Sequence, residues 1–196
     1  MRIYYLHGYN NEKGESHRLL RQAIAAYLCN GDSEELTFSD LSGADESPGA
    51  ELKAKEYVCR LKAGKQGKPY ITGFVPFSIS HSSNTWAVLF SREECGLDIQ
   101  YPRRADAAGI SARFFAPEDA AYIAEHEQEF FRLWARRESL VKAAGTSAAE
   151  SDVPSVLPES VYYRDCNYLI RDVLIPGAPE LSAAICLLQN DSENQQ

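Results

Sequence analysis

The sequence predicts an α+β fold made of two halves. Strand-like segments, in which polar and apolar residues alternate, are interspersed with helix-like segments, in which apolar residues recur three and four positions apart. The order strand, helices, strands occurs roughly twice along the 196 residues. Such an order favours an α+β arrangement. We therefore expect an N-terminal half at residues 1–95, a C-terminal half at residues 96–190 and a disordered tail at residues 191–196.

The first half is expected to begin with a strand and a helix, and to end with strands. The first helix should start at Ser16, a plausible N-cap, and pack an apolar face that includes Leu19 and Ile24. The expected elements are, in order, a strand at 2–6, a helix at 16–28, a loop at 42–50, a helix at 51–63, a turn and strand at 64–71, and a turn beside the strand 86–90.

The second half is expected to place its helices between strands. Pro117 suits the first position of a helix, and Glu118 and Asp119 suit its first turn, where the helix dipole favours acids. Gly145 is a natural C-terminal stop. The expected elements are a strand at 95–101, two helices from 117 to about 145, an exposed loop at 145–160 and a hairpin at 168–188.

Composition excludes several classes of protein. The net charge of −8 lacks the basic excess of a general nucleic-acid binder. No apolar run approaches the roughly 20 residues that span a bilayer, and the start MRIYYLHGYN has no signal-peptide pattern. The five cysteines are scattered and odd in number, which argues against a disulfide framework and a structural zinc site. We expect a cytoplasmic protein with reduced thiols.

The strand GLDIQ carries one acidic side chain beside an amide. Because side chains alternate along a strand, Asp98 and Gln100 should share one face while Leu97 and Ile99 share the other. We expect the apolar face to pack inward and the polar face to point into a cleft or solvent. A carboxylate and an amide oxygen there could hold Mg²⁺. The alternative is an exposed strand end with two polar residues.

The helix expected at residues 130–145 carries an acid and a base one turn apart. Glu138 and Lys142 lie in a row with Trp134, at the edge of an apolar stripe. They could form a plain surface pair worth about 0.3–0.5 kcal/mol. The functional alternative makes Glu138 a metal ligand or general base and Lys142 a phosphate clamp.

His81 lies between small hydroxyl residues in the segment SISHSSN. A histidine in this setting is usually a turn residue. Short hydroxyl donors beside an imidazole are also suited to cradling a phosphate. Both interpretations remain open from the residues alone.

Five motifs in this order resemble the 4'-phosphopantetheinyl transferases of the larger, surfactin-synthetase-activating type. That family shows GKP, FNISHS with a following Trp, GIDIE, RF…E, and a Trp–Lys–Glu–Ser signature followed by Lys and Gly. The matching segments here are Gly67–Pro69, FSISHS at 77–82 with Trp86, GLDIQ at 96–100, Arg113–Phe115 with Glu118, and Trp134 to Lys142 with Gly145.

The resemblance implies an activity and a fold. The family moves the phosphopantetheine arm of coenzyme A (CoA) onto a serine of an acyl or peptidyl carrier protein and releases 3',5'-ADP. Its carriers are acidic and serve fatty-acid, polyketide or nonribosomal-peptide synthesis. The family fold has two pseudo-symmetric α+β halves with the CoA site at their interface, and a monomer is expected.

The resemblance also implies a role for each matched residue. Asp98, Gln100 and Glu138 would hold Mg²⁺, and Glu138 would help deprotonate the carrier serine. Lys142 would contact the diphosphate of CoA. Three residues would complete the binding of CoA: Lys68 in the nucleotide pocket, and Ser80 and His81 at a phosphate. Arg18 and Arg21 are further candidates for the nucleotide site.

Three departures from the family pattern leave rival interpretations open. Gln100 replaces the second acid of GIDIE, Arg137 replaces the lysine of the Lys–Glu–Ser signature, and Ser78 replaces an asparagine. The first rival is a CoA-binding relative with impaired catalysis, which Gln100 favours. The others are a metal-dependent phosphohydrolase and an α+β interaction module in which the charged pairs are structural.

Overall fold

The computed structural model describes residues 1–43 and 47–189, and it divides the chain into two compact units. The first unit is Met1–Arg92, and the second begins at Glu93. Each unit combines helices with a four-stranded sheet, which confirms the α+β fold class. The boundary expected at residues 95 and 96 stays a prediction. The expected tail at 191–196 and part of the loop at 42–50 lie outside the described residues.

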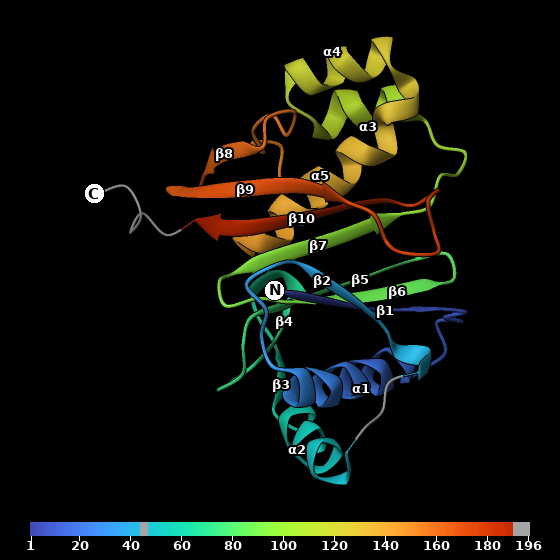
Figure 1. Ribbon diagram of the computed structural model, residues 1–196. Helices are drawn as coiled ribbons and strands as arrows, with labels where there is room; N and C mark the ends of the chain where they lie inside the picture. Colours follow the sequence, from blue (N-terminus) through green and yellow to red (C-terminus); the bar gives the residue numbers. More distant parts are fainter. Residues whose placement is uncertain (44–46, 190–196) are drawn as a thin grey trace. The chain divides into compact units, whose positions relative to one another are not determined.

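The sheet of the first unit has the strand order β2-β1-β6-β5. Strand β1 pairs in parallel with β2 and antiparallel with β6, and β6 pairs antiparallel with β5. The elements of this unit are β1 (Arg2–His7), α1 (Glu15–Asn30), β2 (Thr37–Asp40), α2 (Pro48–Val58), β3 (Leu61–Ala63), β4 (Pro69–Ile71), β5 (Phe77–Ser82) and β6 (Thr85–Phe90). Helix α1 lies between the sheet and α2 (Figure 1).

An aromatic and aliphatic core holds the first unit together. Leu19, Leu20 and Ile24 of α1 pack with Trp86 and Phe90 of β6, and all five are fully buried. Each such side chain contributes roughly 1.5–3 kcal/mol when it leaves water. The apolar face predicted for the first helix is therefore confirmed.

Two helix boundaries in the first unit differ from those predicted. Helix α1 begins at Glu15, and Ser16 is not its N-cap, because its hydroxyl accepts a hydrogen bond from the buried indole of Trp86 at 2.9 Å. Helix α2 begins at Pro48, where the side chain of Ser47 caps it. It ends at Val58 because residues 61–63 pair with β4 as a strand.

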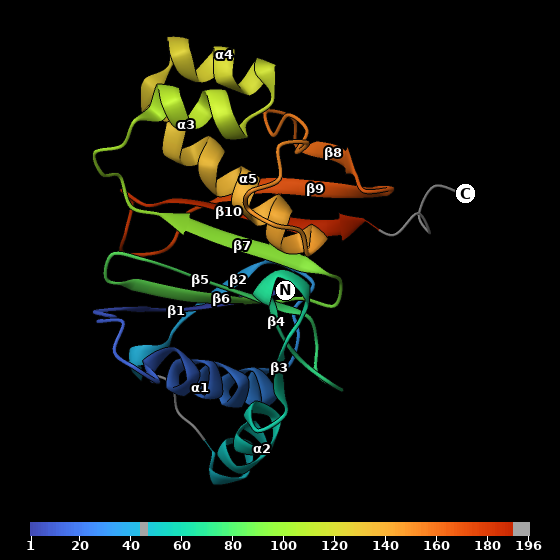
Figure 2. The same cartoon turned by 180° about the vertical axis from the view of Figure 1, so that it is seen from behind.

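The sheet of the second unit is antiparallel, with the strand order β7-β10-β9-β8. Helix α5 packs on β7, β10 and β9, and α3 and α4 lie toward its N-terminal end (Figure 1 and Figure 2). The elements are β7 (Cys95–Gln100), α3 (Ala107–Phe114), α4 (Pro117–Glu125), α5 (Phe130–Ala144), β8 (Ser160–Tyr163), β9 (Cys166–Val173) and β10 (Ser182–Gln189).

The second unit agrees with most of the predicted elements. Pro117 occupies the first turn of α4, and α5 ends at Gly145, whose φ of 64° is left-handed. The predicted C-terminal hairpin is formed by β9 and β10. Helix α3 and strand β8 were not predicted. No helix of the described residues has the length and hydropathy needed to cross a bilayer.

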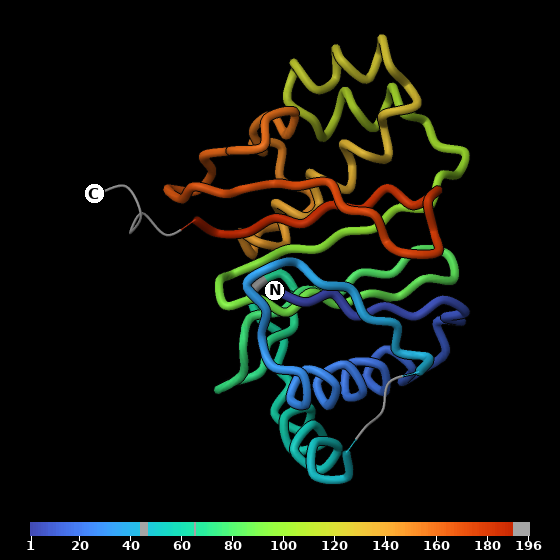
Figure 3. The backbone as a smooth tube through the Cα atoms, in the orientation of Figure 1, coloured from blue at the N-terminus to red at the C-terminus, as the bar shows by residue number. Residues whose placement is uncertain are grey.

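Residues 145–160 lead from α5 to β8 as the predicted loop, but this loop is not exposed throughout. The chain leaves α5 and turns back toward β8 (Figure 3), and it buries Val153 and Val156 on the way. The buried arginine Arg136 of α5 holds this segment by donating to the backbone oxygens of Val156 and Pro158 at 2.6 and 2.7 Å.

Candidate active site

A glycine lets α5 approach strand β7 closely. A Cβ atom at Gly96 would lie 1.8 Å from the backbone oxygen of Ser139 and 2.8 Å from the backbone nitrogen of Ala143. No side chain fits at such distances, so this contact requires glycine. A glycine inside a strand is a known signal of close backbone approach, and it was the sequence feature that our prediction overlooked.

This close contact places Lys142 beside Asp98. The ammonium Nζ of Lys142 donates to Asp98 Oδ1 at 2.7 Å and to the backbone oxygen of Leu97 at 3.0 Å. Lys142 therefore forms an ion pair with Asp98 on a different element. A surface i,i+4 pair with Glu138 does not by itself describe Lys142. A hydrogen-bonded ion pair of this kind is stronger than one between exposed side chains.

Asp98 and Gln100 share one face of β7, as the alternation predicted. The amide Nε2 of Gln100 donates to Asp98 Oδ2 at 2.6 Å. Asp98 is only 3% exposed and faces α5, whereas Gln100 is partly exposed. The expectation of a polar face in a cleft or solvent was therefore wrong for Asp98, because the glycine contact brings the helix over it.

Glu138 lies one turn before Lys142 on α5 and is also largely buried, with a side chain 14% exposed. Arg137 Nη1 donates to Glu138 Oε1 at 3.1 Å. Burial raises the pKa of Glu138 above its ordinary value, and the nearby Asp98 carboxylate raises this pKa further, while Arg137 and Lys142 oppose the shift. A carboxylate with a raised pKa is a stronger base than an ordinary one.

Arg137 fixes the surroundings of Glu138. Its guanidinium, which is 1% exposed, donates to the backbone oxygens of Phe114, Ala148 and Glu150 at 2.7, 3.0 and 2.6 Å. One side chain thus ties α5 to the end of α3 and to the segment after Gly145. A lysine has a single ammonium and lacks the planar fork that serves several carbonyls at once.

The other predicted residues belong to the first unit. Ser80 and His81 lie on β5, opposite Ala87 and Trp86 of β6. Ser80 is buried, and the exposed ring of His81 contacts the ring of Tyr9 with centroids 5.3 Å apart. The turn predicted at His81 was wrong, because residues 77–82 pair as a strand and the turn follows at Ser83, whose φ is 52°.

Lys68 lies just before β4 and is partly buried. Its role in the nucleotide pocket, like the roles of Ser80 and His81, stays a prediction. The structure brings Asp98 and Gln100 of β7 into direct contact with each other and Asp98 into contact with Lys142 of α5. Glu138 lies on α5 with Lys142, near enough to Asp98 for the two carboxylates to interact.

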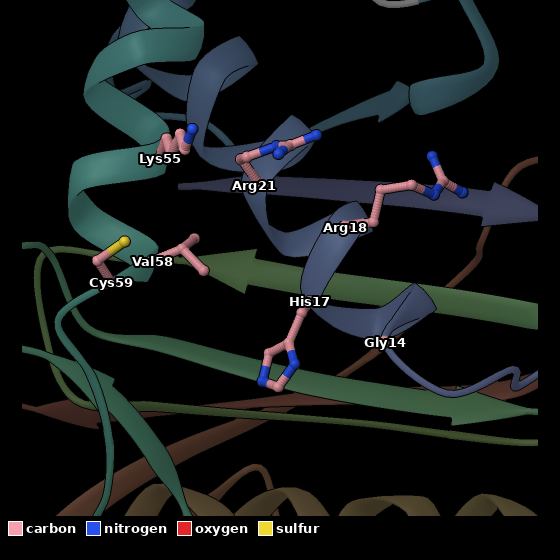
Figure 4. Close-up of a pocket in the computed structure, with 7 residues that line it drawn as sticks. All are labelled: Gly14, His17, Arg18, Arg21, Lys55, Val58 and Cys59. Carbon is pink, nitrogen blue, oxygen red and sulfur yellow. The ribbon is translucent and has the colours of Figure 1, made fainter.

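A basic cavity of about 350 Å³ lies between α1 and α2 of the first unit (Figure 4). Arg18, Arg21 and Lys55 contribute positive charge to its lining, to which His17 also belongs. The Nε atom of Arg21 is buried and has no hydrogen-bond partner within the described residues. An unsatisfied buried donor of this kind is uncommon in proteins. The full lining is Gly14, His17, Arg18, Arg21, Lys55, Val58 and Cys59.

The described residues hold no group of three His, Cys, Asp or Glu side chains that could ligate a metal ion by themselves. Mg²⁺ usually takes only one or two protein carboxylates, with substrate phosphates and waters as its other ligands. Asp98 and Glu138 supply two carboxylates, and Gln100 supplies an amide oxygen. These hard oxygen donors fit a magnesium ion that a phosphate ligand helps to bind.

Comparison with known proteins supports the resemblance. Residues 94–158, which contain β7 and all of α5, match the family model of the 4'-phosphopantetheinyl transferase superfamily. The 4'-phosphopantetheinyl transferase AcpT of Salmonella typhimurium is 37% identical over 114 residues, covering 53% of this chain and 59% of the relative. A 4'-phosphopantetheinyl transferase of Bacillus subtilis is 33% identical over 86 residues, or 40% of this chain and 38% of the relative.

These matches cover only part of each protein. The chain spans 59% of the length of the Salmonella relatives and less than half of the Bacillus one. The resemblance predicted from the five motifs is nevertheless confirmed by the family model and by the relatives. The part of the chain that matches the family model is the part that carries Asp98, Gln100, Glu138 and Lys142.

Proposed function

We propose that this protein transfers the 4'-phosphopantetheine group from CoA to a serine of an apo acyl or peptidyl carrier protein and releases 3',5'-ADP. The observation that carries the proposal is the site formed by Asp98, Glu138 and Lys142 on β7 and α5. This site lies in the segment that matches the transferase family model.

In this mechanism Glu138 is the general base. It accepts the proton of the carrier serine hydroxyl, directly or through a water, and its raised pKa suits that task. The serine oxygen forms a bond to the β-phosphorus of CoA, and the bond from that phosphorus to the bridging oxygen breaks. The departing 3',5'-ADP takes the electron pair. Lys142 donates to the diphosphate and offsets the charge that develops there.

The proposed metal is Mg²⁺, held by Asp98, Glu138 and the amide oxygen of Gln100. When bound, such an ion neutralises charge on the phosphate oxygens. Gln100 provides an oxygen without a charge, so metal affinity should be lower than with a second acid at this position. This residue is also the feature that favours the second candidate function, a CoA-binding relative with impaired catalysis.

CoA itself is proposed to be held by residues of the first unit. Ser80 and His81 bind a phosphate, Lys68 lines the nucleotide pocket, and the basic cavity around Arg18 and Arg21 takes an anionic part of the nucleotide. The buried and unpartnered Nε of Arg21 supports this assignment. A guanidinium and a phosphate form charge-assisted hydrogen bonds of good geometry.

The carrier protein is proposed to dock on the basic surface that follows β7. Arg103, Arg104 and Arg113 are exposed, and a shallow cavity of about 190 Å³ lies beside the first two against Phe130 and Phe131. An acidic partner would complement these charges, although the chain as a whole carries −8. We also propose that the protein is a monomer and that it lies in the cytoplasm; the five free cysteines support the second of these proposals.

Reversing one charge tests this docking surface. Arg113→Glu is expected to weaken binding of an acidic carrier about tenfold, because a like charge would replace an attractive one. Binding of CoA should stay within twofold of the wild type. Both affinities can be measured by titration calorimetry with the same preparation. Equal losses for carrier and CoA would reject the assignment of Arg113 to the carrier surface.

Intact-protein mass spectrometry tests the activity. Apo carrier proteins of different classes are incubated with this protein, CoA and Mg²⁺, and a mass gain of one phosphopantetheine group is expected. CoA binding without any mass gain would favour the impaired relative. Phosphate release that needs no carrier would instead indicate a phosphohydrolase.

A further inference from the structure

The two carboxylates of the active site already have cationic partners. Asp98 Oδ1 accepts a hydrogen bond from Lys142, and Asp98 Oδ2 accepts one from the amide of Gln100, at 2.7 and 2.6 Å. Glu138 Oε1 accepts one from Arg137 at 3.1 Å. The formal charges of these two acids and two cations sum to zero. The folded site by itself therefore offers a further cation little net attraction.

We infer that the divalent cation enters this site only together with an anionic diphosphate group, and that Lys142 admits it by exchanging Asp98 for the phosphate oxygens. The inference rests on the proposed function, which supplies the diphosphate of CoA as the ligand. It adds an order of events for the side chains: Lys142 moves from Asp98 to the diphosphate, and Asp98 Oδ1 would then be able to act as a metal ligand.

The two cations of the site differ in their freedom to move. Arg137 is 1% exposed and is held by three backbone oxygens as well as by Glu138. Lys142 is 28% exposed, donates to the backbone oxygen of Leu97 as well as to Asp98, and carries its ammonium on a flexible four-carbon stem. The exchange of partners therefore belongs to Lys142, while Arg137 stays in place and keeps Glu138 oriented.

Gln100 keeps the net charge of this group of side chains at zero, and the proposed order of binding depends on that charge. A glutamate at this position would give the same group of side chains a net charge of −1, and it could not donate to Asp98. The amide adds no charge and occupies Asp98 Oδ2 as a donor. Gln100 is thus a specificity-determining residue that makes metal binding conditional on the phosphate ligand.

Binding of Mn²⁺, followed by electron paramagnetic resonance, tests this inference without any transfer reaction. The wild-type protein should bind Mn²⁺ weakly alone and at least about tenfold more tightly with inorganic pyrophosphate or CoA, after subtraction of protein-free mixtures. Gln100→Glu and Lys142→Met should each bind Mn²⁺ alone at least about tenfold more tightly than the wild type, since each makes the site net negative.

Gln189→Glu is the matched control. This variant makes the same Gln-to-Glu change at the last residue of β10. The first residue of β10, Ser182, is the one that pairs with Gln100. Gln189 lies seven positions after Ser182 along the strand, which is roughly 24 Å at the usual rise per residue. The control should bind Mn²⁺ as the wild type does. Circular dichroism verifies that each variant is folded.

The possible outcomes separate the inference from the proposed function. Wild-type binding of Mn²⁺ alone that is as tight as in Gln100→Glu would overturn the inference. So would equal affinity with and without pyrophosphate. The arms with metal alone or with pyrophosphate need neither CoA nor a carrier protein. A failure confined to CoA therefore counts against the proposed function, while these arms still decide the role of Lys142 and Gln100.

Discussion

The two units of this protein have the same pairing pattern in three of their four sheet strands, but they differ in the polar residues that they bury. In the first unit β1 pairs with β6 and β6 with β5, and in the second β7 pairs with β10 and β10 with β9, always antiparallel. In each unit the paired strands come from corresponding places in the chain order. The fourth strand differs: β2 adds to the first strand of its unit, whereas β8 adds to β9.

The buried polar residues show the difference in chemistry. Those of the first unit are serines and a threonine, while the four buried charged residues of the described chain, Asp98, Asp119, Arg136 and Arg137, all lie in the second. Burying a charge is costly unless it is paired and hydrogen-bonded. Two related strand arrangements thus have different interiors: the buried polar residues of the first unit are uncharged, whereas the second unit also buries charged residues, which are hydrogen-bonded, such as Asp98 to Lys142 and Arg137 to Glu138.

The largest effect that we expect is the loss of transfer rate when Glu138 of the second unit is removed. Glu138→Ala is expected to lower the rate of pantetheinyl transfer by roughly 10²–10⁴-fold, because the variant lacks the proposed general base. Glu56→Ala, an exposed glutamate on α2 of the first unit, should leave the rate within twofold of the wild type. Both rates can be measured by mass spectrometry of the carrier. A Glu138→Ala rate near that of the control would exclude the role we assign to Glu138.

The largest loss of folding stability is expected when Arg137, a buried arginine of the second unit, is replaced. Arg137→Met is expected to lower the free energy of unfolding by about 3–5 kcal/mol, because Glu138 and three backbone oxygens lose their donor. Arg60→Met, at an exposed arginine of the first unit, should cost less than about 1 kcal/mol. Urea unfolding compares the two. Similar losses would mean that burial does not distinguish the units as we infer.

A pair of glycines offers a comparison of backbone packing. Gly96→Ala should destabilise the protein by about 3 kcal/mol, at the upper end for overpacking, because its Cβ would meet the backbone of α5. Gly49→Ala in α2 meets nothing within 4 Å and should stabilise the protein by about 0.4–1 kcal/mol. Thermal unfolding gives both values. A tolerated Gly96→Ala would show that α5 can withdraw from β7.

Local patterns predicted the parts of the fold that local forces determine. The strand alternation placed Asp98 beside Gln100, and the apolar stripe and Gly145 defined α5. The pattern failed where a partner distant in sequence decides. Ser16 is a good N-cap by type, but the indole of Trp86, 70 residues away, takes its hydroxyl. The segment at 145–160 looks exposed by composition, yet the buried arginines of α5 hold it down. The ion pair of Asp98 with Lys142 spans 44 residues.

The smallest effect we expect is the pH dependence of stability that Glu138 causes. Its pKa in the folded protein lies above the ordinary value of 4.5, which we take for the unfolded chain. Between these two values the folded protein binds more protons than the unfolded chain, so stability falls as the pH rises through that window.

Glu138→Gln removes this titration. In metal-free buffer the gain in stability of the variant over the wild type should be larger at pH 7 than below pH 4.5, where the titration of Glu138 no longer contributes. A constant difference across the range would mean that Glu138 has the same pKa in both states. In the first unit the lowered pKa of Asp32 gives a slope of the opposite sign, so the difference between the wild type and Glu138→Gln, in which the contribution of Asp32 cancels, reports on Glu138.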